Sequence, residues 1–557
     1  MMKRAFMALT LCLAATLAQA VPAKQGLWKT ITLADGQQIK AELTGDEFFH
    51  YWRTADGNAY TYDNESQRYV SVNLNERAKT ANAARQTANL RRSSQAKAAA
   101  KTVYTGEKRG LIILVEFPGK KDGSIEAKQF KTPEAHDFYD KVINQENFTD
   151  PDKGYIESVY DYFLAQSKGQ FKFKFDVVGP YKLGNFYSYY GLDNSSGQDV
   201  HLGKMIYDAC KKADADVDFS KYDWDGDGVV DQLAILYAGQ GQNTNADDPN
   251  LIWPQEGSLK ALGSDQAPFE RDGVTIEKFA ISCELGEGGV VDGIGTICHE
   301  FSHCFGLPDM YDTGSFGTTE LNYGTYVWDL MNMGNYLDGG FKPAGYTAWE
   351  RMACGWQQPI ELSRDTVVNS MKPLSGGGDT YIIYNDNHKD EYFLLENRQQ
   401  TGFDAGLYAS GLLVSHVDYD AEAWKANTVN ADKERFSILA ADNSKKRTVD
   451  DVKGDLYPFN GNNSISDSSM PATTLANKNA DGTYNLGKEV TDITQNADGT
   501  ISFQFRNLRT SGIQSATASG TQGCRKGVYN LNGQRIGNTL STLPSGIYIV
   551  NGKKIIK

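Results

Sequence analysis

Residues 299–309 read HEFSHCFGLPD, and no other stretch of the 557-residue chain restricts its fold and chemistry as strongly. His299 and His303 are four residues apart, so an α-helix places both imidazoles on the same face. Two imidazoles in this arrangement can bind one zinc ion, and Glu300 then lies beside the metal as a base for its bound water. The pattern predicts a zinc-dependent hydrolase. The alternative is a chance HExxH on an ordinary surface helix.

The residues after the second histidine favour a catalytic centre. Gly306 can take the left-handed conformation that ends a helix, Leu307-Pro308 then turns the chain, and Asp309 returns a carboxylate as third ligand. Two histidines and one carboxylate leave the fourth position of a tetrahedral zinc ion to water, which makes the site an open one. The alternatives for the third ligand are Asp312, Glu320 and Glu350, but the glycine spacing favours Asp309.

Size and charge set further limits. At 557 residues the chain is too long for one hydrophobic core and should contain two or three domains. The 55 glycines and 30 tyrosines favour strands and turns over a helical bundle. A net charge of −14 disfavours nucleic-acid binding, for which a basic face is expected. The sequence does not predict an oligomeric state.

The N-terminus has the pattern of an export signal. Lys3-Arg4 precedes an apolar run over residues 5–15, and Ala18-Gln19-Ala20 gives a cleavage site before Val21. We therefore expect residues 1–20 to be a signal peptide and the protein to be secreted or held at the cell surface. Cysteine pairing cannot be read from the sequence; after cleavage six cysteines remain, namely Cys210, Cys283, Cys298, Cys304, Cys354 and Cys524.

Residues 21–104 are predicted to be a pro-region and linker. Residues 21 to about 90 contain short alternating runs separated by turn dipeptides, which indicates a small strand-rich unit. Residues 77–101 are rich in Ala, Arg, Lys and Ser and suit a connector, with Arg91-Arg92 as a candidate activation site. Because no cysteine lies between residues 21 and 209, a pro-region thiolate cannot block the metal. A pro-region carboxylate or histidine stays open as the blocking ligand.

Residues 105–365 are predicted to be the catalytic domain, and a second metal site is a candidate within it. In DWDGDGVVD, the four residues Asp223, Asp225, Asp227 and Asp231 fall at positions 1, 3, 5 and 9 of a calcium loop. Position 12 is Ala234, so the segment is not an EF-hand. Clustered carboxylates repel one another unless a cation neutralises them. The alternative is a solvated aspartate turn that enters a strand.

The segment TYVWDLMNMG after the zinc motif suggests a support for the metal ligands. Zinc proteases of the metzincin kind place a methionine-containing turn under the site, and Met331 is the better candidate here, with Met333 second. Tyr336 or Tyr346 is a candidate hydrogen-bond donor to the oxyanion, and the alternative for each is a structural tyrosine.

The rest of the chain reads as strands. Residues 366–508 predict a β-sandwich packed against the catalytic domain, residues 509–521 a linker, and residues 522–557 a compact strand-turn-strand module. His416 and Asp418 are weak ligand candidates, since a lone histidine within a strand is more often structural. The predicted fold class is therefore multidomain α+β, with a strand-rich pro-region, a metzincin-like protease domain and an all-β sandwich.

Four stretches together resemble one known family. HEFSHCFGLPDMYD, the WDLM turn, DWDGDGVVDQLAILYAG and GDEFFHYWRTADGNAYTYD are similar to segments of the immune inhibitor A-like secreted bacterial metalloproteases, over roughly residues 21–505. The resemblance implies zinc ligation by His299, His303 and Asp309, Glu300 as general base, an inhibitory pro-region and structural calcium. The C-terminal end is similar to the tails that direct Bacteroidetes proteins to the type IX secretion machinery.

Two functions follow from these features. The first is a secreted zinc endopeptidase that is made as a latent precursor and hydrolyses proteins or peptides. The second is a secreted or surface adhesion protein whose β-rich parts bind a host or glycan ligand and whose metal site is vestigial. The intact Glu300 argues against the second function, because a dead site tends to lose its base first.

Overall fold

The computed structural model describes residues 20–63, 66–77, 79, 104–194, 197–245, 250–262, 266–314, 322–445, 448–509, 527–531, 534–550 and 553–557. The chain divides into two compact units, of which one ends at Leu508 and the other begins at Arg509. Most of the predicted signal peptide and connector, including Arg91-Arg92, and nearly all of the predicted linker lie outside the described residues. Among the helices that are described, none has the length and apolar character needed to cross a membrane.

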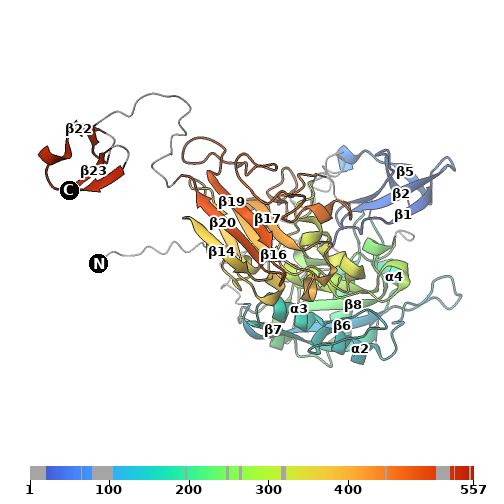
Figure 1. Cartoon of the computed structure of the whole chain (residues 1–557). Coiled ribbons are helices and arrows are strands. Elements are labelled where there is room, and N and C mark those ends of the chain that lie inside the picture. Colours follow the sequence, from blue (N-terminus) through green and yellow to red (C-terminus); the bar gives the residue numbers. More distant parts are fainter. Residues whose placement is uncertain are drawn as a thin grey trace. The chain divides into compact units, whose positions relative to one another are not determined.

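The N-terminal part of the first unit is an antiparallel sheet in which each strand pairs with the next (Figure 1, blue). Glycines with positive φ, such as Gly36 at 85° and Gly57 at 88°, lie in its turns, where the sequence has the Asp-Gly dipeptides. The strands are β1 (Trp28–Thr32), β2 (Gln38–Gly45), β3 (His50–Arg53), β4 (Ala59–Asp63) and β5 (Arg68–Ser71).

The centre of the first unit is a five-stranded sheet in the order β7-β6-β8-β12-β9. Four of its strands are parallel, and β9 at the edge runs antiparallel. Parallel strands are buried on both faces, which is why GLIILVE and LAILYAG are continuous apolar runs. The bounds are β6 (Gly106–Glu116), β7 (Phe171–Lys182), β8 (Leu233–Gln240), β9 (Gln255–Ser258) and β12 (Lys278–Leu285).

Helices cover both faces of this central sheet. Ile112 and Leu114 of β6 pack with α2 (Ala135–Asn144), α3 (Val159–Gln166) and α7 (Gly295–Cys304), and the two labelled helices α2 and α3 lie beside the sheet in Figure 1. The alternate residues Leu111, Ile113 and Val115 pack on the other face, where α5 (Leu202–Ala213) lies. The zinc motif is therefore on a helix that rests against the sheet, close to its antiparallel edge strand.

The C-terminal part of the first unit consists of two sheets around one core. One sheet has the order β13-β15-β16-β17-β18 and the other β14-β20-β19 (Figure 1). One apolar cluster contains Phe393 and Val414 of the first sheet and Phe503 of the second. The bounds are β13 (Ile360–Glu361), β14 (Thr366–Met371), β15 (Tyr381–Tyr384), β16 (Glu391–Arg398), β17 (Gly411–Asp418), β18 (Phe436–Ile438), β19 (Lys488–Gln495) and β20 (Ile501–Asn507).

This β-rich part shares a core with the helices of the central part. Leu394, Val417 and Phe436 belong to the same apolar cluster as Phe301 of α7. Both parts accordingly fall within one compact unit. The mixed α and β composition agrees with the sequence-based expectation, while the metzincin-like and sandwich arrangements stay predictions. Smaller elements are α4 (Tyr187–Tyr190), α6 (Leu259–Leu262), α8 (Ala348–Ala353), α9 (Ala421–Lys425), β10 (Phe269–Arg271) and β11 (Val274–Ile276).

The second unit is a four-stranded antiparallel sheet in the order β22-β21-β23-β24. Its strands are β21 (Val528–Tyr529), β22 (Arg535–Gly537), β23 (Ile547–Val550) and β24 (Lys553–Ile556). The strands occupy the region in which the sequence predicts a strand-turn-strand module.

Candidate metal centre

Helix α7 ends in a turn that turns the chain back toward its own histidines. Gly306 has φ 83°, and its N–H donates to the His303 carbonyl while the Leu307 N–H donates to the Ser302 carbonyl. This pair of bonds is the glycine-dependent Schellman C-cap, in which a side chain at the glycine position is strained. The turn brings Asp309 toward His299 and His303, as the sequence predicts.

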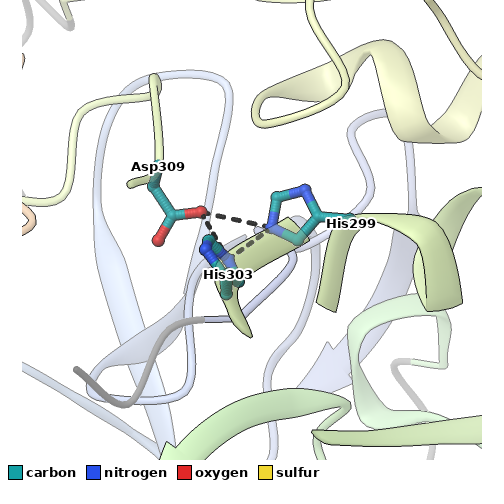
Figure 2. A group of neighbouring side chains, drawn as sticks. All are labelled: His299, His303 and Asp309. Carbon is teal, nitrogen blue, oxygen red and sulfur yellow. Dashed lines mark hydrogen bonds and ion pairs between the residues drawn. The ribbon is translucent and has the colours of Figure 1, made fainter. Parts of the chain in front are cut away.

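The ligand atoms of these three residues converge (Figure 2). The two Nε2 atoms of His299 and His303 are 3.0 Å apart. Asp309 Oδ1 lies 3.2 Å from Nε2 of His299 and 3.3 Å from Nε2 of His303. Zinc ligands at about 2.0–2.2 Å and tetrahedral angles are separated by about 3.3–3.5 Å, so the spacing suits one ion.

The second nitrogen of each imidazole fixes its tautomer. His299 Nδ1 lies 2.8 Å from the Leu330 carbonyl, and His303 Nδ1 lies 2.7 Å from the Leu307 carbonyl. A carbonyl only accepts hydrogen bonds, so both Nδ1 atoms carry the proton and both Nε2 atoms present a lone pair. Two lone pairs and a carboxylate oxygen that face one another in a fully buried space repel unless a cation lies between them. The donor set therefore fits a zinc ion.

Asn427 holds Asp309, the predicted third ligand, and sequence reasoning missed this contact. The Asp309 N–H donates to Asn427 Oδ1 at 2.7 Å, and Asn427 Nδ2 donates to Asp309 Oδ2 at 2.6 Å. These two bonds leave Oδ1 of Asp309 directed at the histidines. The amide N–H bond to Oδ2 favours the ionised form of the Asp309 carboxylate.

The chain at Met331 lies under the histidines. Leu330 supplies the carbonyl that fixes His299, and the Met331 carbonyl accepts from the Met310 N–H at 2.8 Å. The Met331 N–H donates to Asp329 Oδ1 at 2.7 Å, and the Met331 side chain is fully buried. The backbone of this turn thus contacts the predicted ligand His299 and Met310, the residue that follows the predicted ligand Asp309. Its role as a support stays a prediction.

Buried charges from the β-rich part hold the same turn. One guanidinium nitrogen of Arg398, on β16, donates to the Trp328 carbonyl at 2.9 Å, and another donates to the Gly345 carbonyl at 3.2 Å. Asp404 and Glu396 neutralise Arg398, with shortest distances of 2.6 Å and 3.1 Å. A buried guanidinium with both partners satisfied fixes the position of the backbone that it contacts.

Glu300 faces the N-terminal segment of the chain. Its Oε1 accepts a hydrogen bond from the Val21 N–H at 2.9 Å, and both residues are fully buried. Burial raises the pKa of Glu300 well above its usual range, the Val21 N–H lowers it, and the nearby Asp309 raises it further. A backbone N–H of the predicted pro-region thus reaches the predicted base. The carboxylate or histidine left open by the sequence as a ligand that blocks the metal stays a prediction.

Residues 20–25, here called the N-terminal segment, are bound through their main chain. Side chains of the central part donate to three consecutive carbonyls: Tyr311 to Ala20 at 2.9 Å, Trp253 to Val21 at 3.0 Å and Tyr336 to Pro22 at 2.6 Å. The Lys24 N–H donates to the Asn243 carbonyl at 2.9 Å. Contacts to successive main-chain groups are independent of side-chain identity, which is how an extended peptide is held.

The two candidate tyrosines are placed differently. The hydroxyl of Tyr336 donates to the Pro22 carbonyl and accepts from Asn243 Nδ2 at 2.9 Å, so it points at a peptide carbonyl next to Glu300's partner. The hydroxyl of Tyr346 is bonded to Ser302, and its buried ring stacks on Trp356 at 5.6 Å. This placement favours Tyr336 as the donor to a reacting carbonyl and gives Tyr346 a packing role.

The alternative third ligands lie elsewhere. Asp312 accepts from the backbone N–H groups of Gly314 and Asn322 at 3.0 Å and 3.1 Å. Glu350 caps α8 through the Thr347 N–H at 2.6 Å. Glu320 falls outside the described residues. Neither Asp312 nor Glu350 joins the group formed by the two histidines and Asp309.

The candidate calcium loop gathers three of its four aspartates. Single carboxylate oxygens of Asp223, Asp225 and Asp227 lie within 4.8 Å of one another. Asp231 is outside this group; it accepts from the Trp224 N–H, and burial raises its pKa to about 6. The segment leads into β8 and not into a helix, as the residue at position 12 predicts.

The weaker candidates have structural partners. His416 Nε2 lies 2.8 Å from Glu391 Oε1, and its ring stacks on Phe393 at 4.6 Å. Asp418 pairs with Lys433 at 2.6 Å. Cys210, Cys283, Cys298, Cys304 and Cys354 form no disulfides, whereas Cys524 lies outside the described residues.

An α/β fold that presents two helical histidines, a returning aspartate and an adjacent glutamate defines the class of metal-dependent hydrolases with an open site. Comparison with known proteins narrows this class. Residues 95–358 match the family described as immune inhibitor A peptidase M6, catalytic domain. Residues 95–358 are therefore similar to the catalytic domain of that metalloprotease family, which confirms the resemblance drawn from the motifs for this part of the chain. The similarity of the C-terminal end to secretion tails stays a prediction.

Two named relatives are similar over the same part of the chain. The chain is 24% identical over 290 residues to the pre-pro-metalloprotease PrtV of Vibrio cholerae, which covers 44% of this chain and 30% of that protein. It is 27% identical over 264 residues to immune inhibitor A of Bacillus thuringiensis, covering 42% and 37% of the two chains. The similarity thus spans about a third of the length of these curated relatives.

Proposed function

We propose that the protein is the latent precursor of an exported zinc-dependent endopeptidase. The observation that carries this proposal is the convergence of two bare Nε2 atoms and an ionised carboxylate oxygen next to a buried glutamate. The match of residues 95–358 to a family of metalloproteases supports peptide bonds as the bonds that this protein hydrolyses. The order of parallel strands and the Met331 turn support a metzincin-like catalytic domain.

Zinc bound by His299, His303 and Asp309 would polarise the scissile carbonyl and acidify the attacking water. Glu300 accepts the proton of this water and returns it to the leaving amine. Tyr336 donates a hydrogen bond to the carbonyl oxygen as negative charge develops there. Tyr311, Trp253 and Asn243 hold the substrate main chain by the hydrogen bonds they make with residues 20–24.

Latency follows from the position of the N-terminal segment. This segment uses the main-chain contacts that a substrate needs, and the Val21 N–H is hydrogen-bonded to Glu300. Cleavage after Ala20, as predicted from the signal sequence, would leave the α-amino group of Val21 at the position now 2.9 Å from Glu300 Oε1. A charged amine there would pair with the carboxylate and neutralise the base. The word pre-pro in the name of the Vibrio relative supports a precursor.

The test compares casein hydrolysis by the precursor, by protein from which residues 21–104 have been removed, and by the processed Glu300→Ala variant. We expect activity only in the processed wild type, loss of that activity with a zinc chelator and recovery with added zinc. Equal activity of the Glu300→Ala variant would overturn the catalytic assignment, and an equally active precursor would overturn latency. An inactive processed wild type with bound zinc would favour the adhesion function.

Calcium at Asp223, Asp225 and Asp227 is part of the proposal. Three carboxylates that approach within 4.8 Å repel one another, and a hard cation with oxygen ligands relieves this repulsion. We expect calcium to raise the melting temperature of the wild type but not that of Asp225→Asn, measured by calorimetry in zinc-loaded protein. An equal shift in both proteins would contradict the site. The C-terminal module remains our candidate for contact with the secretion machinery.

A further inference from the structure

The side chain of His50, in the N-terminal sheet, is enclosed by residues of the central part next to those that bind the N-terminal segment. The imidazole of His50 stacks on the indole of Trp253 with ring centroids 4.9 Å apart and an angle of 24° between the planes. On its edge lies Gly197, where a Cβ atom would approach His50 Cε1 to 2.9 Å. The His50 side chain is only 11% exposed. A flat slot thus encloses a flat ring.

The polar wall of this slot is acidic. His50 Nε2 lies 3.4 Å from Asp193 Oδ2 and 3.2 Å from Gln242 Nε2. Asp199 is paired with Asp193 through a β-bridge and accepts from the Trp253 N–H at 3.1 Å. Burial, and then the neighbouring Asp193, raise the pKa of Asp199 well above its usual range.

Three atoms in the slot are buried without a hydrogen bond from any described residue: Oδ1 of Asp193, Oδ1 of Asp199 and Nδ1 of His50. The side chain of Asp193 is 10% exposed. Carboxylates in such a setting favour a cationic partner, because a nearby positive charge stabilises their ionised form. The imidazole of His50 lies in the position of that partner, but it makes no hydrogen bond with Oδ1 of Asp193 or Oδ1 of Asp199.

The slot around His50 adjoins the residues that bind the N-terminal segment. The indole N–H of Trp253 donates to the Val21 carbonyl, while the face of the same indole stacks on His50. Gln242 contacts His50, and the next residue, Asn243, accepts from the Lys24 N–H. A peptide that follows the path of the N-terminal segment therefore passes directly beside the slot.

We propose that Asp193, Gly197, Asp199, Gln242 and Trp253 form a substrate subsite for a flat basic side chain, arginine or histidine, which His50 occupies in the precursor. The inference rests on the proposed function, because the slot opens only when the pro-region leaves. The indole face and the narrow edge at Gly197 select a planar group, and the carboxylate pair selects a positive one. The same slot would thus bind His50 of the pro-region in the precursor and a basic side chain of the substrate in the processed protein.

The test uses processed wild-type protein and a series of quenched peptides in which arginine replaces glutamine at one position at a time around the cleaved bond. We expect one position at which arginine raises kcat/KM about 10-fold or more, mainly through KM. The Asp193→Asn/Asp199→Asn variant should lose this preference, measured as the ratio of kcat/KM for the arginine peptide to kcat/KM for the glutamine peptide. The control Asp137→Asn, an exposed acidic residue on α2, should behave like the wild type.

The outcomes separate the two proposals. Cleavage of the peptides with no position that prefers arginine would overturn the subsite and leave the protease function intact. No cleavage of any peptide or of casein would instead overturn the proposed function. If the double variant does not fold, as judged by its zinc content, Gly197→Ala narrows the slot without changing its charge, and it should reduce the arginine preference.

Discussion

At the scale of single residues, Asn427 decides where the third ligand points. Asn427 is 118 residues from Asp309 in sequence and is hydrogen-bonded to both the N–H and the Oδ2 of Asp309. Removal of a group that orients a metal ligand lowers metal affinity by about 10- to 100-fold. We expect this loss for Asn427→Ala, measured by competition with a zinc chelator. The exposed Asn387→Ala serves as control, and an affinity equal to that of the wild type would contradict the role of Asn427.

Tyr336 gives a second prediction at this scale. If its hydroxyl stabilises the developing oxyanion, Tyr336→Phe should lower kcat by about 100-fold with little change in KM or zinc affinity. The measurement is steady-state kinetics of the processed protein on a peptide substrate. The control Tyr484→Phe alters an exposed tyrosine. A change confined to KM would show that Tyr336 only binds the substrate main chain.

The residues predicted from the sequence and the one it missed differ in a simple physical way. His299, Glu300, His303 and Asp309 are related by one helix and one turn, whose periodicity and left-handed glycine are readable in eleven letters. Asn427 has no such local pattern, because an asparagine in a loop with φ 52° is typical of many turns. Only the folded chain brings it to Asp309.

At the scale of elements, we expect the turn at the C-terminal end of α7 to contribute to zinc binding as well as to end the helix. Gly306→Ala puts a Cβ atom at φ 83°, which costs about 1–2 kcal/mol, and shifts the Leu307 carbonyl that fixes His303. Gly355 ends α8 in the same kind of turn, with φ 77° and open space around it. We expect similar losses of unfolding free energy in Gly306→Ala and Gly355→Ala, but weaker zinc binding only in Gly306→Ala. Equal zinc affinities would contradict this prediction.

The strand pair β16–β17 carries an acid-sensitive contact. Burial alone would raise the pKa of Glu391, but hydrogen bonds from His416, Asn385 and the Ala476 N–H outweigh it and lower that pKa to about 2. Because the folded-state pKa lies below the usual 4.5, the stabilisation is complete above pH 4.5 and is lost as the pH falls through 2.

This pH dependence is measurable as a difference between two proteins. Glu391→Gln should be less stable than the wild type at pH 7, and the gap in unfolding free energy should close between pH 4.5 and 2. Denaturant unfolding at several pH values checks it. The exposed Glu361→Gln should show no such gap, and a gap that persists at low pH would assign the effect to packing instead of charge.

Elements were predictable where their pattern is local. The apolar runs of β6 and β8 and the Asp-Gly turns of the N-terminal sheet follow from period and turn chemistry. The antiparallel edge strand β9, with the sequence QEGS, has no strand pattern of its own and is formed by its pairing with β12. The shared core of the central and β-rich parts also depends on contacts far apart in the chain.

At the scale of the whole molecule, we expect the predicted metal centre to need the β-rich part. Asn427 and Arg398 both lie beyond residue 358, where the family match ends. A chain that ends at residue 365 should therefore bind zinc weakly and show no activity after processing. A chain that ends at Leu508 lacks only the second unit and should keep both properties. Zinc titration and casein hydrolysis of the two truncated chains check this, and an active shorter chain would contradict it.

The contact between Asn427 and Asp309 also fixes an order in time. A ribosome makes the N-terminal sheet first, the HEFSHCFGLPD helix later and Asn427 last of the three. If the N-terminal segment is the inhibitor that we propose, it is made before the predicted third ligand is positioned, which requires nearly all of the first unit. A growing chain would then never hold a complete metal centre without its inhibitor.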